Sequence, residues 1–307
     1  MPQPSPLLIC FDQLPAWRLG CYGQFHESTP TFDDLAAQST VFDRYFVSPM
    51  EPSLLDQLAN RCPDLAVLRI GDHDADVAPA DLLNDPPAKH VASFLGEPSP
   101  LRVLLIKGLP VLPWNEDDGD VPSVSIEDVI LRQLLEILLP ILDDDQMVIV
   151  TALRGDVTTD PTANPDWLKS VGEAAVHVPL IIHAETTSSA DRESRMLTPA
   201  DLIDFLVPAD KTSSPSLAEW RDGIPDQSLS YSSLHAKAIR TEHWTLVERT
   251  SGDNDELSDL EEPDVRLFHY PEDPWLVRDV VGEYFELVES YRQTGRIEPI
   301  QSESGSN

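Results

Sequence analysis

Residues 7–12 of this chain read Leu-Leu-Ile-Cys-Phe-Asp, and this short stretch decides the fold class. An apolar run that ends in Asp is typical of a buried central strand whose carboxyl end opens onto a site. Similar apolar runs, separated by amphipathic segments, recur along the chain. We predict strands at 41–47, 65–70, 102–107, 146–151 and 178–182, and helices at 31–38, 126–141 and 198–206. Ser125, with Asp128 three residues later, predicts a capped start for the second of these helices. Strands that alternate with helices favour an α/β fold with a mostly parallel sheet covered on both faces.

The chain changes character from residue 237 onward. Residues 238–247 alternate as one strand, residues 265–269 can pair with it, and a helix follows. The face of that helix is predicted to carry Val280, Tyr284, Leu287, Val288 and Tyr291. We therefore expect three parts: an α/β core at 1–235, a strand-pair and helix subdomain at 236–300, and a disordered tail at 301–307.

Two stretches are rich in Ser, Pro and charged residues, at 186–195 and 210–229. Such composition predicts solvent-exposed connections. The acidic stretch around Asp72, His73 and Asp74 lacks the spacing of a calcium-binding loop, so a solvated turn is the favoured interpretation.

The charge balance restricts the partners of this protein. Its 54 acidic and 21 basic residues give a formal net charge of −33 over 307 residues. Binding to nucleic acid or to an anionic membrane surface depends on clustered cations, so both are excluded. The simplest reasons for so much acid are solubility or a salt-rich cell interior. The odd number of cysteines, at 10, 21 and 62, argues against a disulfide framework.

No stretch of the sequence approaches the roughly 18 consecutive apolar residues of a membrane span. The first strand is predicted to begin near residue 6, which leaves no room for a basic region and an apolar signal segment. We therefore expect a cytoplasmic protein, unless the native chain begins further upstream.

Several segments resemble, in order, those of one family. Leu19-Gly-Cys-Tyr-Gly23, residues 29–36 and residues 47–53 follow the first strand, and similar segments recur at 173–182, 239–247 and 267–274. This series resembles the sulfatase family, part of the alkaline phosphatase superfamily. Its collinearity carries the resemblance, since each segment alone is common. The resemblance implies a three-layer α/β/α sandwich with a mostly parallel central sheet, plus a small C-terminal antiparallel sheet and helix.

The resemblance also implies a divalent metal, usually calcium, held by two carboxylates after the first strand and by an Asp with an Asn or His after a later strand. Here those positions read Asp12-Gln13 and Leu153-Arg154. Calcium prefers several charged oxygen ligands. One carboxylate beside an apolar residue and a cation should not hold it, so we expect no cofactor.

The nucleophile motif departs from the family in the same way. Met50 stands where the family has the cysteine that becomes formylglycine, and a thioether cannot form a hydrated aldehyde. Ser53 is retained, but Leu54 replaces the supporting Arg, and Val111 replaces a His that contacts sulfate. Lys169 lies about one residue from the place of a substrate-binding Lys. These residues are predicted to be remnants of a pocket.

Arg154 suggests a specific hypothesis. If the fold is kept, Asp12 and Arg154 project from neighbouring strand ends, and the guanidinium can pair with the carboxylate in place of the ion. The alternative is that Arg154 simply points into solvent.

Two functions remain open. The first is a catalytically inactive, sulfatase-like binding or regulatory protein, with an anionic or sugar-like small molecule or a protein as its partner. The second is a divergent hydrolase of sulfuric or phosphoric esters with a relocated nucleophile, either Ser53 or Ser48. Ser53 is also well placed to cap a helix that begins near Leu54.

Overall fold

The computed structural model describes residues 5–23, 28–71, 85–96, 98–107, 124–142, 146–184, 190–208, 215–250 and 265–297. The chain forms two compact units. The first comprises Met1–Val47, Glu51–Thr159 and Ala174–Asp226, and the second comprises Ser48–Met50, Asp160–Glu173 and Gln227–Asn307.

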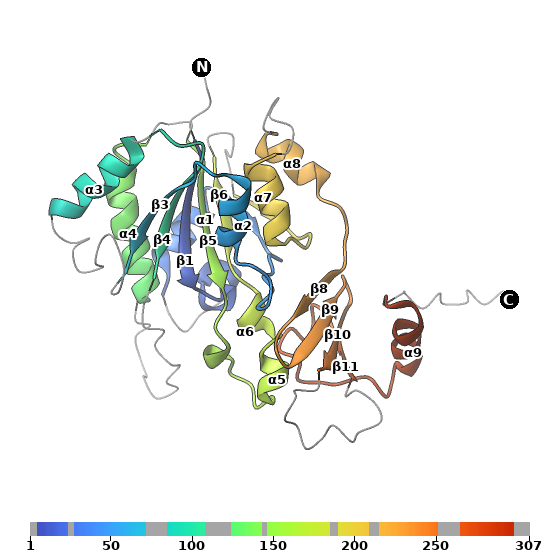
Figure 1. The fold of residues 1–307 in the computed structure, drawn as a ribbon. Coiled ribbons are helices and arrows are strands. Elements are labelled where there is room, and N and C mark those ends of the chain that lie inside the picture. The colour runs from blue at the N-terminus through green and yellow to red at the C-terminus, as the bar shows by residue number, and fades with distance from the viewer. Residues whose placement is uncertain are drawn as a thin grey trace. The chain divides into compact units, whose positions relative to one another are not determined.

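The first unit is built on a seven-stranded sheet with the order β3-β4-β1-β5-β6-β2-β7 (Figure 1). Its strands are β1 (Leu7–Gln13), β2 (Thr40–Phe42), β3 (Ala66–Ile70), β4 (Arg102–Ile106), β5 (Val148–Arg154), β6 (Leu180–His183) and β7 (Asp191–Glu193). Only β6 runs antiparallel to its neighbours among these strands. The prediction of a mostly parallel sheet is therefore confirmed, and β1 lies between parallel β4 and β5.

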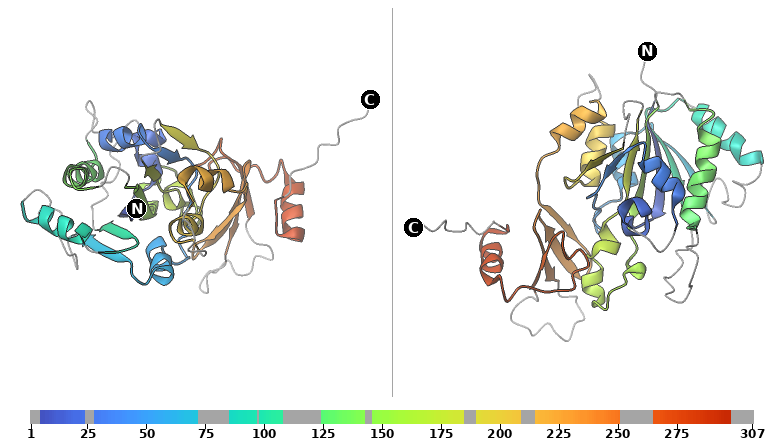
Figure 2. Two further views of the ribbon diagram at one scale, coloured as in Figure 1. Left: turned by 90° about the horizontal axis from the view of Figure 1, so that it is seen from above. Right: turned by 180° about the vertical axis from the view of Figure 1, so that it is seen from behind.

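Helices cover both faces of this sheet, which gives the expected three layers (Figure 2). On one face lie α1 (Pro30–Ala36) and α4 (Ile126–Leu138), and on the other lie α2 (Leu54–Arg61) and α7 (Pro199–Leu206). The first unit also contains α3 (Asp85–Gly96), most of α6 (Glu173–Val176) and α8 (Leu217–Gly223). The buried core runs through the strands, and β1 contributes five consecutive buried residues from Leu7 to Phe11.

The start of α4 shows how the two helices on one face are joined. Ser125 caps α4 by accepting a hydrogen bond from the Asp128 backbone N–H, as the sequence predicts. The carboxylate of Asp128, however, accepts hydrogen bonds from the backbone N–H groups of Thr31 and Phe32. It therefore satisfies the open N–H groups at the start of α1. The helix ends at Leu138, shortly before Pro140, rather than at residue 141.

The structure corrects three expectations about the first unit. The predicted strand at 41–47 is shortened to β2, and Tyr45 and Phe46 form isolated bridges instead. The stretch 186–195 contains β7, and the stretch 210–229 contains α8. Both elements are rich in polar residues that bind one another. Arg221 of α8 pairs with Asp191 of β7, and Ser216 and Glu219 form a reciprocal cap at the start of α8.

The second unit is built on a four-stranded antiparallel sheet with the order β11-β10-β9-β8. Its strands are β8 (Leu229–Ser232), β9 (Ala236–Arg240), β10 (Trp244–Arg249) and β11 (Val265–His269). The short helix α5 (Asp166–Lys169) and the helix α9 (Phe285–Thr294) complete the unit. The predicted small C-terminal antiparallel sheet with a helix is confirmed.

Details of this unit differ from the sequence expectation. The stretch 238–247 is a hairpin of β9 and β10 rather than one strand, because Thr241 Oγ1 accepts a hydrogen bond from the Trp244 N–H and closes a turn. The sheet already starts at Leu229, before the predicted boundary at residue 236. Val280 is buried but precedes α9. The tail 301–307 lies outside the described residues.

None of the helices in the described part of the chain combines the length and the apolar character that crossing a bilayer requires.

Candidate functional site

Residues 12–13 and 153–154, which the resemblance matches to a metal site, meet at the carboxyl ends of β1 and β5. The two strands are parallel neighbours, and their register places Gln13 opposite Arg154. The Leu14 N–H donates to the Arg154 carbonyl at 3.1 Å, which continues the pairing past the end of the sheet. Because the carboxyl ends of parallel strands share one edge, residues 12–13 and 153–154 are neighbours at that edge.

The side chains of Asp12 and Arg154 form an ion pair. Arg154 Nη2 donates to Asp12 Oδ2 at 3.0 Å. The predicted contact is therefore confirmed. The side chains are 57% exposed for Arg154 and 28% for Asp12, so the guanidinium also reaches solvent while it holds the carboxylate.

The chain immediately after β5 is fixed by a close approach to α6. The N–H groups of Gly155 and Asp156 donate to the carbonyls of Ala175 and Ala174 at 3.2 and 2.7 Å. A β-carbon on Gly155 would collide with the Ala174 carbonyl oxygen, so only glycine fits this position. The end of β5 is consequently held by hydrogen bonds to the chain after β1 and to α6.

This donor set does not fit a calcium ion. Asp12 supplies one carboxylate and Gln13 one amide oxygen, whereas calcium takes 6–8 oxygen ligands and needs several negative charges. The Asp12 carboxylate already accepts from a guanidinium, which would repel a divalent ion. Across the described ranges, no three His, Cys, Asp or Glu side chains gather in a way that could hold a metal.

The residues predicted as remnants of the pocket are found in different settings. Met50 belongs to the second unit and is 52% exposed. Lys169 lies in the last turn of α5, also in the second unit, and is half-buried. Val111 lies outside the described residues. Leu153 is the next-to-last residue of β5 and is half-buried.

Ser53 is confirmed as the N-cap of α2. Its hydroxyl accepts a hydrogen bond from the Asp56 N–H at 3.2 Å and donates to Asp56 Oδ2 at 2.6 Å. The Ser53 N–H donates to the same carboxylate, which completes a reciprocal cap. Ser48, the other hydroxyl considered as a nucleophile, is within hydrogen-bond distance of the Ser232 backbone.

A small pocket of about 280 Å³ lies elsewhere in the first unit. It is lined by Gly20, Cys21, Asp33, Ala36, Ala37, Val41, Ala190, Asp191 and Arg192. Burial raises the pKa of the Cys21 thiol to about 12, so this cysteine stays protonated and is a poor nucleophile. The Arg192 guanidinium is bound to the Cys21 carbonyl and to Asp43. None of the three cysteines, all of which lie in the described ranges, forms a disulfide.

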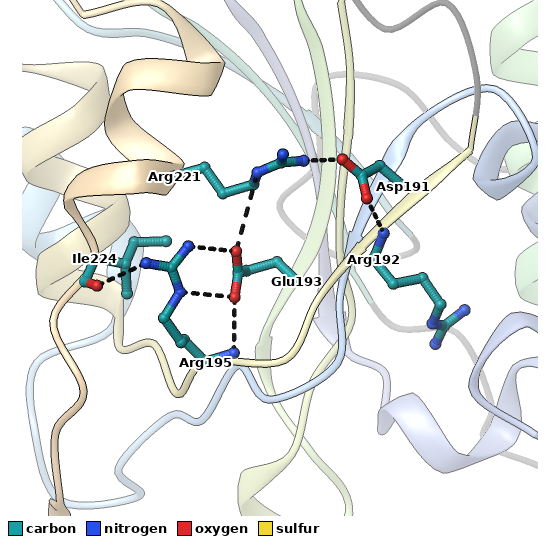
Figure 3. A network of polar contacts seen from close by, with 6 residues as sticks. All are labelled: Asp191, Arg192, Glu193, Arg195, Arg221 and Ile224. Atoms are coloured by element: carbon teal, nitrogen blue, oxygen red, sulfur yellow. Dashed lines mark hydrogen bonds and ion pairs between the residues drawn. The ribbon is translucent and has the colours of Figure 1, made fainter.

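A network of ion pairs joins β7 to α8 (Figure 3). Glu193 is buried, and its carboxylate accepts two hydrogen bonds from the Arg195 guanidinium at 2.8 and 2.6 Å. Arg195 also donates to the Ile224 carbonyl at the end of α8, and Arg221 of that helix pairs with Asp191. The hydrogen bond from Arg195 lowers the pKa of Glu193. Sequence reasoning missed this network; its one signal was the Asp-Arg-Glu-Ser-Arg order at 191–195.

A second ion pair lies inside the second unit. Arg240 of β9 is fully buried, and its Nη1 donates to Glu173 Oε2 at 3.0 Å. Its guanidinium lies over the Tyr270 ring, 4.6 Å from the centroid, and 5.7 Å from that of Tyr231. The sequence offered a signal here, because both residues fall in family-like segments, but their contact was not foreseen.

Comparison with known proteins relates this fold to one group of enzymes. No family model and no curated protein matches the sequence. Among solved structures, the similar ones include the protein yidJ of Bacteroides fragilis, whose assignment as a sulfatase is provisional. The TM-score is 0.65 at 13% identity, covering 95% of this chain and 94% of that one.

Two further neighbours have established names. The 2-O GAG sulfatase BT1596 has a TM-score of 0.62 at 13% identity, covering 95% of this chain and 90% of that one. The phosphonate monoester hydrolase of Agrobacterium radiobacter has a TM-score of 0.61 at 14% identity, covering 95% and 94%. At such low identity the likeness concerns the fold. The chain therefore has the fold of the sulfatases and phosphonate monoester hydrolases of the alkaline phosphatase superfamily.

Proposed function

We propose that this protein is a sulfatase-like binding or regulatory protein that does not hydrolyse sulfate esters and carries no resident metal. The observation that carries the proposal is the contact of Arg154 with Asp12, because it sets a cation against the carboxylate that a metal would need. Metal ions and preorganised charges supply the largest part of transition-state stabilisation in such reactions. Met50 adds to the case, since its thioether has no proton to lose and cannot act as a hydroxyl nucleophile.

A hydrolase with Ser53 as a relocated nucleophile is the competing function. The Ser53 hydroxyl already makes both hydrogen bonds of the α2 cap with Asp56. An attack by this oxygen would therefore disrupt the start of the helix. No contact of Ser53 among the described residues favours this second function.

The partner we propose is a small anionic or sugar-like molecule. The Arg154 side chain is more than half exposed, so it can contact an anionic group while it remains bound to Asp12. A long polyanion is disfavoured, because the formal net charge of −33 repels it over the Debye length of about 8 Å.

An activity screen tests the proposal. The purified protein is assayed with an aryl sulfate, an aryl phosphate and an aryl phosphonate monoester, with added Ca²⁺, Mg²⁺, Mn²⁺ or Zn²⁺ and with EDTA. We expect background rates in every case, identical in wild type and Ser53→Ala. Turnover that depends on a metal or on Ser53 would overturn the proposal.

A thermal-shift screen tests the partner class. Sulfated monosaccharides should raise the melting temperature of the wild type more than their unsulfated parents do. The increment should disappear in Arg154→Gln. An equal response to both sugars, or an increment that survives in Arg154→Gln, would reject Arg154 as the contact.

A further inference from the structure

The ion pair at the ends of β1 and β5 has a role beyond the loss of chemistry. We infer that Arg154 is a built-in replacement for a divalent cation, so that the charge of the Asp12 carboxylate is balanced without a metal. The inference rests on the proposed function and deepens it, because it states how the site is held once the metal ligands are gone.

The surroundings of Asp12 explain why a counter-charge is needed there. Asp12 directly follows five buried residues of the central strand β1, and its side chain is only 28% exposed. A carboxylate that has lost much of its hydration is costly unless a cation or several hydrogen bonds compensate it. The protein as a whole is strongly acidic, with a formal net charge of −33, and therefore adds repulsion rather than compensation.

Arg154 is well suited to supply that charge. It lies opposite Gln13 in the parallel register, one residue along from Asp12, on a strand about 4.8 Å away. Its guanidinium is always charged and presents several donors on a long side chain. The guanidinium and a metal ion would compete for the same Asp12 Oδ2 atom, so Asp12 can be neutralised by one or by the other but not by both.

One substitution should make the site depend on a metal ion in place of the Arg154 guanidinium. Arg154→Asp places a second carboxylate on the neighbouring strand end, beside the Gln13 amide. We expect this variant to melt below the wild type in EDTA and to recover by roughly 5 °C with CaCl₂ at a concentration well above its Kd. The matched control is Arg154→Asn, which also removes the cation but adds no charge. The wild type measures the calcium response of the acidic surface itself.

The outcomes separate cleanly. A calcium response of Arg154→Asp above those of Arg154→Asn and the wild type supports the inference, and a response no larger than theirs overturns it. If Arg154→Asp does not fold even with calcium, the exchange Asp12→Arg with Arg154→Asp takes its place. Recovery of the wild-type melting temperature supports the inference, and failure to recover overturns it.

These readouts are independent of ester hydrolysis. If Arg154→Asp shows no added calcium response while the wild type is inactive, the proposed function stands and the replacement role of Arg154 is rejected. If the wild type hydrolyses an ester with added metal, the proposed function falls whatever the melting data show.

Discussion

Two ion pairs of this protein have the same separation, 3.0 Å, in contrasting surroundings. Arg240 is fully buried in the second unit and its partner Glu173 is 10% exposed at the side chain, whereas Arg154 is 57% exposed in the first unit. Both members of the buried pair stand in segments that resemble the sulfatase family. The exposed pair stands at positions where the resemblance implies metal ligands. The two pairs therefore share a distance but differ in burial.

The contrast follows from the energetics of charge burial. Removal of one partner from a buried pair leaves an uncompensated charge at low dielectric, so such pairs resist substitution. A pair with one exposed member, such as Asp12 and Arg154, keeps part of its hydration and contributes less to stability.

The largest effect is expected from Arg240→Met. The variant leaves the Glu173 carboxylate buried with its guanidinium partner removed, and the free energy of unfolding should fall by about 3–5 kcal/mol. Urea unfolding monitored by circular dichroism measures it. The double variant Glu173→Leu with Arg240→Met should recover part of the loss. A loss below about 1 kcal/mol for the single variant would show that burial does not separate the two ion pairs.

An intermediate effect is expected from Glu193→Gln, because Glu193 is buried but its partner Arg195 is 27% exposed. Loss of charge-assisted hydrogen bonds should cost about 1–3 kcal/mol at neutral pH. Since Arg195 lowers the folded-state pKa of Glu193, the wild-type carboxylate stabilises the fold above its unfolded-state pKa. This contribution is lost as the pH falls through the folded-state pKa.

The pH dependence provides the control for that prediction. Stability measured between pH 7 and pH 3 should fall less steeply in Glu193→Gln than in the wild type. Glu51→Gln, a change at an exposed glutamate, should leave the slope unchanged. Equal slopes in all three proteins would contradict the assignment.

A smaller effect is expected from Ser53→Ala. The change removes the hydroxyl that accepts from the Asp56 N–H, and loss of an N-cap costs about 1 kcal/mol. Ser53→Asn should retain most of the stability, because Asn is also a good cap. If Asn is as destabilising as Ala, the retained Ser53 is not explained by capping.

The smallest effect is expected from Arg154→Gln. The Arg154 guanidinium is 57% exposed, so water can partly take its place at Asp12; the loss should stay under about 1 kcal/mol and shrink further in 1 M salt. Paired urea titrations at low and high salt measure it. A loss as large as that of Arg240→Met would place both pairs in one class.

Much of the fold could be predicted because its signals are local. The apolar run from Leu7 to Phe11 and the Ser125 cap each depend on neighbours in sequence, and both are found as expected. Elements whose charges are satisfied at a distance were missed. The strand β7 was interpreted as a connection because the partners of Glu193 and Asp191 include Arg221, which lies on α8.

The candidate site could be predicted only in part. Collinear segments placed Asp12 and Arg154 at adjacent strand ends, and their contact was foreseen because parallel strands share one edge. The double use of Asp128, as the residue capped by Ser125 and as the cap of α1, had no sequence signal, since Thr31 lies far away in the chain.

By itself, the sequence determined most of the strand and helix pattern, the departure of Gln13 and Leu153 from the metal motif that the resemblance implies, and the opposite charges of Asp12 and Arg154. Only the tertiary structure decided which charges meet and how deeply each pair is buried. The physical reason is that periodicity and caps act within a few residues. The contribution of an ion pair to stability depends instead on how much water the whole fold leaves around its charges.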